Sequence, residues 1–466
     1  MKRTWRFWFA LWLGKTAAAI LKMLGKKGTT FPGKLALKID PWLIKHLGSE
    51  YGEGIILITG TNGKTTTTNL LASILTQAGK SFTCNQAGAN LVTGIAGAML
   101  KDARWSGGTE VKLAVLEVDE ATVPKFCAQI TPQWAVVTNF FRDQLDRYGE
   151  LDTTVRLVRE ALPRETVLIL NADDPLVAQI GSGRDKAVYY GIEKTPQSKS
   201  ESGETREARF CPICGAELSY SLFHYGQLGI YACPQCDFAR PEPDILAGGV
   251  GMENEQLMFS VTWEKGQPAH EGYAVALQGY YNLYNALAAG TAAFKMGIDE
   301  RTIKSGLAAF QAQAGRMESF ALPEGAVTLT LIKNPTGFNQ VIQTLLAAEG
   351  RLALMIVIND QAADGRDISW LWDVNFESLA EEKHRIREVV CSGIRAEEMA
   401  LRLKYAGLSV EQLMVEHDLG KGMRYLQKKR DEGEKVFALP TYTALFPLRD
   451  VLKTYEQEER RLSRNA

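Results

Sequence analysis

Residues 54 to 67 join an apolar strand, a glycine-rich turn and the start of a helix. Their sequence is GIILITGTNGKTTT, in which Gly60 and Gly63 precede Lys64 and Thr65. Such a turn directs backbone N–H groups and a helix N-terminus toward one point, which is typical of a phosphate site. The lysine is expected to reach the outer phosphates of a nucleotide, and the threonine hydroxyl to bind Mg²⁺. The two glycines stand closer together than in a consensus phosphate loop, so this loop is a compact variant. The residues expected to hold the nucleotide here are Gly60, Asn62, Gly63, Lys64, Thr65 and Thr66.

The length and charge of the chain limit what surrounds this loop. A chain of 466 residues is expected to form about three domains. We expect an N-terminal segment over 1–50, a central nucleotide-binding domain over 51–320 and a C-terminal domain over 321–466. The net charge of −1 gives no reason to expect a nucleic-acid partner.

Strand and helix patterns alternate along both larger segments. Buried strands that alternate with helices predict an α/β fold, a parallel sheet with helices on both faces. In the central segment, strands are predicted at 111–118, 134–139, 166–171 and 187–190, and helices at 67–78, 153–161 and 283–296. In the C-terminal segment, strands are predicted at 328–332, 352–358, 387–391 and 435–439, which indicates a second α/β domain.

The first 24 residues are basic, aromatic and apolar. Lys15 and Lys22 interrupt the apolar run, so a membrane-spanning helix is not expected. A signal peptide is disfavoured because the phosphate loop needs cytoplasmic ATP. We expect an amphipathic helix that packs on the body of the protein, and peripheral contact with a membrane surface stays open as the alternative.

Residues 205–245 carry two Cys-x-x-Cys motifs. The pairs Cys211/Cys214 and Cys233/Cys236 predict a four-thiolate zinc ribbon inserted in the central domain. Four thiolates leave no open coordination position, so the predicted role is structural. The three scattered cysteines do not suggest disulfides, which favours a reducing, cytoplasmic setting.

Polar side chains follow the predicted central strands and are expected at one edge of the sheet. Glu117 ends the strand at 111–118 and is expected to bind Mg²⁺, with Asp119 close by. Further candidates for nucleotide contact are Asn139, Asp174, Asn282, Asn285 and Arg316. Simpler structural roles stay open, because Asn282 can cap a helix and the 171–175 turn needs no ligand.

The order of these motifs resembles the central domain of the Mur ligase family, which includes the folylpolyglutamate synthases. The motifs are GTNGKTTT, LEVDEA, TNFFRDQLD, LNADDP, YNLYNALAA and GRME. The cysteine insert and the run NDQAADGRDISWLWD at 359–373 are similar to the synthetase subunits of lipid II isoglutaminyl synthases. Two departures stand out. About 50 residues of this sequence precede the loop, so a UDP-binding N-terminal domain is not expected, which favours a lipid-linked substrate. Gln144 stands where many Mur ligases have a histidine, which puts the metal role of that position in doubt.

The resemblance implies a reaction and a partner. ATP would phosphorylate the α-carboxyl of D-glutamate in the lipid II stem, and ammonia would attack the acyl phosphate. The chain lacks the Gly-x-Cys-x-Gly elbow of a glutaminase, since Cys391 stands in VVCSG. The resemblance therefore implies a separate GatD-like glutamine amidotransferase subunit, whose site would be completed by Asp373, with Asp364 and Asp367 as alternates. The protein would work in the cytoplasm, at the inner face of the cell membrane if the N-terminal segment binds there.

Two other functions stay open at this stage. One is a folylpolyglutamate-synthase-like ligase that acts on a soluble substrate, which the zinc insert and the 359–373 run argue against. The other is a phosphate-loop NTPase whose zinc ribbon binds nucleic acid, which the neutral charge and the ligase motifs argue against.

Overall fold

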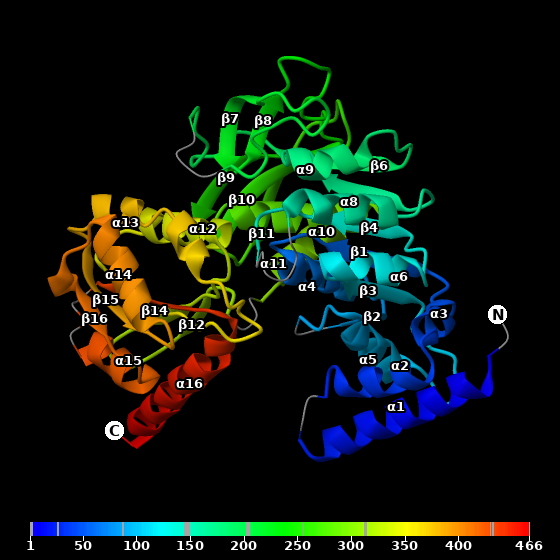
Figure 1. The fold of residues 1–466 in the computed structure, drawn as a ribbon, viewed down its shortest axis with the longest axis horizontal. Coiled ribbons are helices and arrows are strands. Elements are labelled where there is room, and N and C mark those ends of the chain that lie inside the picture. Colours follow the sequence, from blue (N-terminus) through cyan, green and yellow to red (C-terminus); the bar gives the residue numbers. More distant parts are fainter. Residues whose placement is uncertain are drawn as a thin grey trace. The chain divides into compact units, whose positions relative to one another are not determined.

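The computed structural model describes residues 3–25, 28–85, 88–143, 150–201, 206–254, 256–311, 315–428, 430 and 433–465 (Figure 1). The chain divides into two compact units. The first comprises Met1–Phe141, Glu150–Ala276 and Tyr280–Phe310, and the second comprises Arg142–Gly149, Leu277–Gly279 and Gln311–Ala466.

A nine-stranded sheet forms the centre of the first unit, in the order β11-β10-β9-β6-β5-β4-β1-β3-β2. Each neighbouring pair of strands from β2 to β9 in this order is parallel, whereas the pairs β9–β10 and β10–β11 are antiparallel. Their bounds are β1 Gly54–Thr59, β2 Phe82–Cys84, β3 Leu113–Glu117, β4 Trp134–Val137, β5 Val167–Asn171, β6 Ala187–Ile192, β9 Ile245–Glu253, β10 Gln256–Thr262 and β11 His270–Val275. The predicted fold class is confirmed, and the antiparallel edge is an addition that the sequence patterns did not predict.

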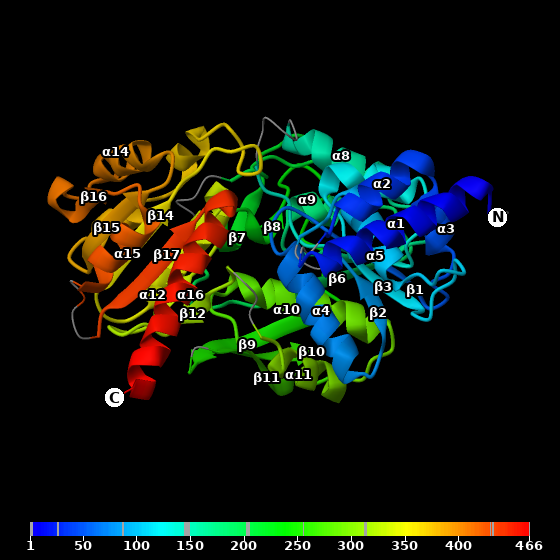
Figure 2. The ribbon, with the colours of Figure 1, turned by 90° about the horizontal axis from the view of Figure 1, so that it is seen from below.

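Helices cover both faces of this sheet (Figure 2). One face packs on α4 (Lys64–Gln77), α10 (Tyr281–Lys295) and α11 (Glu300–Ala308). The other face carries α5 (Val92–Asp102), α6 (Val123–Cys127) and α8 (Leu151–Ala161), and α9 (Pro175–Ala178) follows β5. Successive residues of each strand pack on opposite faces of the sheet, because their side chains point alternately to its two sides. Ile55 and Leu57, for instance, join the core under α5, α6 and α8.

Three helices precede the first strand: α1 Trp5–Met23, α2 Phe31–Ile39 and α3 Leu43–Gly48. One face of α1 is buried through Phe7, Ala10, Leu11 and Gly14, against α2 and α5. No helix in the described ranges is both long and apolar enough to cross a membrane.

The cysteine-rich insertion forms a two-stranded hairpin of β7 (Ser219–Tyr225) and β8 (Leu228–Ala232). The chain returns to the main sheet at β9, which pairs with β6, at the end of the insertion that the sequence analysis placed at 205–245.

The second unit is a six-stranded sheet in the order β12-β13-β17-β14-β15-β16. Its strands are parallel except β12, and separate hydrophobic clusters cover its two faces. The strand bounds are β12 Glu318–Phe320, β13 Val327–Leu329, β14 Leu352–Val357, β15 Ile386–Ser392, β16 Leu413–Val415 and β17 Lys435–Pro440. The helices are α12 Pro335–Ala347, α13 Glu377–Glu381, α14 Ala396–Ala406, α15 Leu419–Lys428 and α16 Tyr442–Asn465. All four strands predicted here are present, and no end is shifted by more than three residues.

Candidate functional site

The turn after β1 forms the floor of the candidate nucleotide site. Gly60 and Gly63 have φ angles of 119° and 86°, which favour glycine. A Cβ on Gly60 would lie 2.3 Å from Thr138 Oγ1, and one on Gly63 would lie 2.0 Å from Asn285 Oδ1. Gly63 is also the N-cap of α4, so the first N–H groups of this helix open toward the turn. The backbone is therefore shaped for close approach of an anion, as the sequence motif predicts.

Lys64 is buried and surrounded by oxygen atoms. Its Nζ donates to the backbone oxygen of Gly60, to Thr61 O at 3.3 Å and to Glu120 Oε2 at 3.1 Å. Burial alone would lower the pKa of Lys64, but the carboxylates of Glu120, Glu117 and Asp119 outweigh it and raise the pKa. The ammonium is therefore charged, and a bound triphosphate would compete with Glu120 for it.

Thr65 and Glu117 present two oxygen atoms side by side. Thr65 Oγ1 donates to Glu117 Oε2 at 2.9 Å, and the other carboxylate oxygen accepts from Asn90 Nδ2 at 3.0 Å. Neighbouring ligands of an octahedral Mg²⁺ with bonds of 2.0–2.1 Å lie about 2.9 Å apart. The two side chains therefore fit the shape of a magnesium site.

Asparagine side chains line the rest of the turn. Asn139, which follows β4, accepts from Asn62 N at 2.9 Å and donates to Asn62 O at 3.1 Å. On α10, Asn285 Nδ2 donates to Asn282 Oδ1 at 2.9 Å. Asn282 lies inside α10, whose N-cap is Tyr280, so the helix-cap role left open for it is wrong. The turn after β1 and the residues after β4 lie side by side because β1 and β4 are neighbouring strands.

Two of the candidates beside the turn are enclosed by the fold. Thr66 is buried within α4. Asp174 is fully buried, and its carboxylate accepts from Phe140 N and from Leu176 N, both at 2.9 Å. Burial raises the pKa of Asp174 to about 7, against the lowering effect of these backbone N–H groups. Its contacts orient the loop that carries Asn139.

The remaining candidates belong to the second unit. Arg316 is half-buried and precedes β12. Asp364 is buried and accepts from Thr443 N at 2.8 Å at the start of α16. Asp367 is exposed and accepts from Ser369 N at 2.8 Å, which lowers its pKa. Asp373 is half-exposed, and its carboxylate lies 3.5 Å from Arg142.

The segment in which many Mur ligases have a histidine begins at Asp143, and only this first residue is described. Asp143 forms an ion pair of 2.6 Å with Lys333. Gln144, Leu145 and Asp146 lie outside the described residues.

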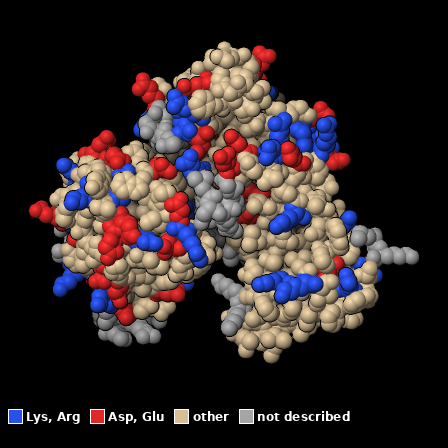
Figure 3. All heavy atoms as spheres, viewed as in Figure 1, with Lys and Arg blue, Asp and Glu red and all other residues tan. Residues whose placement is uncertain are grey.

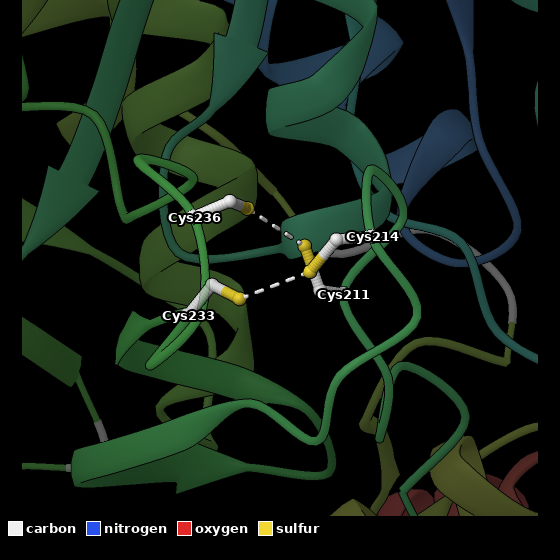
Figure 4. A group of neighbouring side chains, drawn as sticks. All are labelled: Cys211, Cys214, Cys233 and Cys236. Atoms are coloured by element: carbon white, nitrogen blue, oxygen red, sulfur yellow. Dashed lines mark hydrogen bonds between the residues drawn. The ribbon is translucent and has the colours of Figure 1, made fainter.

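The four cysteines of the two motifs meet in the insertion (Figure 4). All four Sγ atoms lie within 4.8 Å of one another, with Cys211–Cys236 at 3.6 Å and Cys214–Cys233 at 3.4 Å. Ligands at 2.3 Å in a tetrahedron are separated by about 3.8 Å, so the cluster is compatible with zinc. The N–H groups of Ile213 and Gln235 donate to Cys211 and Cys233, and such hydrogen bonds orient thiolates toward a metal.

Buried polar contacts hold the insertion on the loops that follow β4 and β5. Gln227 Nε2 donates to Phe140 O at 2.6 Å, and Gly229 N donates to Asp173 O at 2.9 Å. The carboxylate of Asp173 is fully buried and accepts from Arg240 Nε and from Tyr284 Oη. The insertion is thus fixed beside the candidate nucleotide site.

The other cysteines are poor nucleophiles. Burial raises the pKa of Cys84, Cys127 and Cys391 to about 12 in each case. Their thiols are therefore almost fully protonated at neutral pH.

Sequence reasoning missed Glu120 and Asp173. Glu120 stands next to the acids that were singled out, but only the turn after β3 brings it to Lys64, while Asp119 caps that turn through Ala121 N. Asp173 lies in a sequence typical of a turn, and the spacing of residues does not indicate that it pairs with Arg240 in the core.

Two family models match the chain. The "Mur ligase middle domain" matches residues 58–226, and the "MurT ligase C-terminal" domain matches residues 331–445. The first contains the phosphate loop, Glu117 and the first cysteine pair, and the second contains the three candidate aspartates.

Curated relatives match along almost the whole chain. A protein from Staphylococcus aureus named "Lipid II isoglutaminyl synthase (glutamine-hydrolyzing) subunit MurT" is 37% identical over 96% of this chain and 98% of its own length. The protein of the same name from Streptococcus pneumoniae is 35% identical over 94% of this chain and 95% of its own length.

Solved structures share the fold. A pseudomurein peptide ligase type C from Methanothermus fervidus has a TM-score of 0.66 and 25% identity, covering 88% of this chain and 80% of its own. MurF from Acinetobacter baumannii has a TM-score of 0.65 at 16% identity, covering 91% and 80%. With a relative 37% identical over nearly its full length, and with both family models in the expected order, the chain belongs to the MurT family of Mur ligases, which are ATP-dependent ligases that use Mg²⁺.

Proposed function

We propose that this protein amidates the α-carboxylate of D-glutamate in the lipid II peptide stem, forming D-isoglutamine at the expense of ATP in peptidoglycan biosynthesis. The observation that carries the proposal is the grouping of Lys64, Thr65 and Glu117 at a phosphate loop in a chain so similar to MurT proteins. The similarity to MurT proteins indicates the substrate, and the three side chains indicate that ATP and Mg²⁺ activate it.

The proposed reaction has two steps. A carboxylate oxygen of the substrate attacks the γ-phosphorus of ATP, so ADP leaves and an acyl phosphate forms. The nitrogen of ammonia then attacks the acyl carbon, phosphate leaves, and the new amide loses a proton. A carboxylate is a poor electrophile, and phosphorylation provides the leaving group that direct attack lacks.

The residues of the loop would counter the charge of two approaching anions. Lys64 would contact the outer phosphates, and the N–H groups after Gly60 and Gly63 would cradle them. Thr65 and Glu117 would hold Mg²⁺, which offsets phosphate charge when bound. The remaining nucleotide contacts we propose are Asn62, Thr66, Asn139, Asp174, Asn282, Asn285 and Arg316.

Ammonia would come from a separate GatD-like glutamine amidotransferase subunit. The raised pKa values of Cys84, Cys127 and Cys391 support this, because a glutaminase needs a reactive thiolate. Among the three aspartates, Asp373 is the best candidate to orient the partner's catalytic histidine. Asp364 is buried against α16, and both carboxylate oxygens of Asp367 accept from Ser369, whereas the half-exposed carboxylate of Asp373 has a longer contact of 3.5 Å with Arg142.

The zinc ribbon would be structural, with Zn²⁺ held by Cys211, Cys214, Cys233 and Cys236.

The protein would work in the cytoplasm at the inner face of the cell membrane, where ATP and the lipid-linked substrate are both present.

The test is amidation of lipid II with two nitrogen sources. With ATP and ammonium at raised pH, where more ammonia is unprotonated, the isolated chain is expected to form isoglutamine slowly. With glutamine it should need the GatD-like subunit. Lys64→Ala should lower both reactions by about 10²-fold or more, because it removes a charge contact to the transferring phosphate.

The Asp373→Asn variant separates the two sites. It should depress the glutamine-dependent reaction far more than the ammonia-dependent one, because an orienting aspartate acts on the glutaminase alone. An equal loss of both reactions would assign Asp373 to the synthetase site. Asp364 or Asp367 would then be the candidate that orients the partner's histidine. If a folded complex that binds ATP amidates lipid II neither with ammonium nor with glutamine, the proposed function is refuted.

A further inference from the structure

The first helix has two opposite apolar faces, and only one of them is covered, so it is not the simple amphipathic helix that the sequence analysis expected. Phe7, Ala10, Leu11 and Gly14 pack inward. The opposite face presents a row of side chains at helical spacing, each between 50% and 87% exposed: Trp5, Phe9, Trp12, Ile20 and Met23. We call this row the exposed stripe. A helix with apolar side chains on opposite faces normally has both of them buried or in contact with lipid, so the uncovered face requires an explanation.

Neighbouring segments extend the apolar surface. Trp12 Nε1 donates to Trp105 O at 3.1 Å, and Trp105 is itself 54% exposed. Phe31 at the start of α2 and Trp42 before α3 are also more than one-third exposed. Contiguous exposed apolar surface of this kind marks an interaction site in a soluble protein.

Positive charge accompanies these side chains. The first 39 residues contain nine Lys and Arg and no Asp or Glu. Arg6 and Lys22 are exposed on α1, and Lys34 and Lys38 are exposed on α2. Where α1 and α2 lie in Figure 3, the visible surface is largely uncharged or basic. A basic helix with tryptophan and phenylalanine on one face has the composition of helices that lie in the headgroup region of a membrane.

We propose that the exposed stripe, with the basic side chains beside it, binds the surface of an anionic lipid bilayer. The helix lies on the bilayer and does not cross it. A second copy of this chain is a poorer occupant, because it would bring the same Lys and Arg side chains to a surface that is already basic. The inference goes beyond the proposed function: it assigns a binding surface that lies outside the phosphate loop and is independent of it.

Vesicle flotation with the full chain tests the proposal without any substrate. Vesicles of phosphatidylcholine with about one-third phosphatidylglycerol should carry the protein, and the binding should weaken as NaCl rises. Trp5→Ser with Phe9→Ser should bind at least about tenfold more weakly, the factor expected when about 60 Å² of buried apolar surface is lost. Arg6→Gln with Lys22→Gln should bind about 30-fold more weakly on anionic vesicles. Tyr405→Ser is the matched control, because Tyr405 is 71% exposed like Trp5 but lies in the second unit.

The outcomes separate this inference from the proposed function. Far-ultraviolet circular dichroism and amidation of a water-soluble stem-peptide substrate should be unchanged in the stripe variants. Failure of the wild-type chain to float, or equal flotation of wild type and the Trp5/Phe9 variant, would overturn the lipid proposal and leave the amidation proposal intact. Dimerisation that the stripe variant abolishes, without flotation of the wild type, would assign the surface to a second copy instead.

Discussion

Removal of the Arg240 side chain should destabilise the first unit strongly. Asp173 is fully buried, and Arg240 is the charged group that pairs with it, while Tyr284 Oη and Ile192 N donate neutral hydrogen bonds at 2.7 Å and 3.0 Å. His224 Nε2 lies 3.9 Å from the same carboxylate, but burial lowers the pKa of this imidazole, so it is neutral at pH 7. In Arg240→Ala the carboxylate would keep its burial but lose its counter-charge. Breaking a buried pair in this way costs about 3–5 kcal/mol.

The expected fall in melting temperature follows from this energy. At about 2 °C for each kcal/mol, appropriate to a large domain, Arg240→Ala should melt roughly 6–10 °C below wild type. Differential scanning fluorimetry of the full chain measures the shift. Arg209→Ala is the matched control in the same insertion, because the Arg209–Glu217 pair is exposed at 55% and 47%. An exposed pair contributes about 0–1 kcal/mol, so the control should shift by no more than about 2 °C.

A second variant identifies the cause of the loss. Asp173→Asn in the Arg240→Ala background removes the unpaired charge, so the double variant should melt no lower than Arg240→Ala. If Arg240→Ala melts within about 2 °C of wild type, the reasoning from the buried charge is refuted.

Glu117→Gln should raise the Mg²⁺ concentration for half-maximal amidation about tenfold or more, and an unchanged Mg²⁺ titration would remove Glu117 from the metal site. Gly63→Ala should weaken ATP binding in equilibrium titration, since its Cβ would lie 2.0 Å from Asn285 Oδ1 at a φ of 86°; wild-type affinity would contradict the described turn. The purified protein should contain about one equivalent of zinc by elemental analysis, and Cys214→Ser should lose both the metal and thermal stability; metal-free protein from a chelator-free preparation would disprove the zinc assignment.

The local motifs could be recognised from sequence because each depends on residues close together in the chain. The glycines, Lys64 and Thr65 of the phosphate loop lie within six residues, and each cysteine pair lies within four. Strand cores such as 134–137 and 352–357 were predicted because a buried parallel strand is a continuous apolar run. The strands β9, β10 and β11 were missed, since their patterns are half-polar and follow an insertion.

Short spacings and burial periodicity are enough to identify the phosphate loop, the four-cysteine cluster and the two α/β sheets from the order of the residues alone. The tertiary structure, in contrast, sets which acids meet which partners. Glu120 reaches Lys64 while Asp119 caps a turn, and Asp174 is enclosed while Asp373 is half-exposed. It also decided that α1 covers one of its two apolar faces and leaves the other in solvent. These outcomes depend on contacts between residues distant in sequence, which spacing along the chain does not encode.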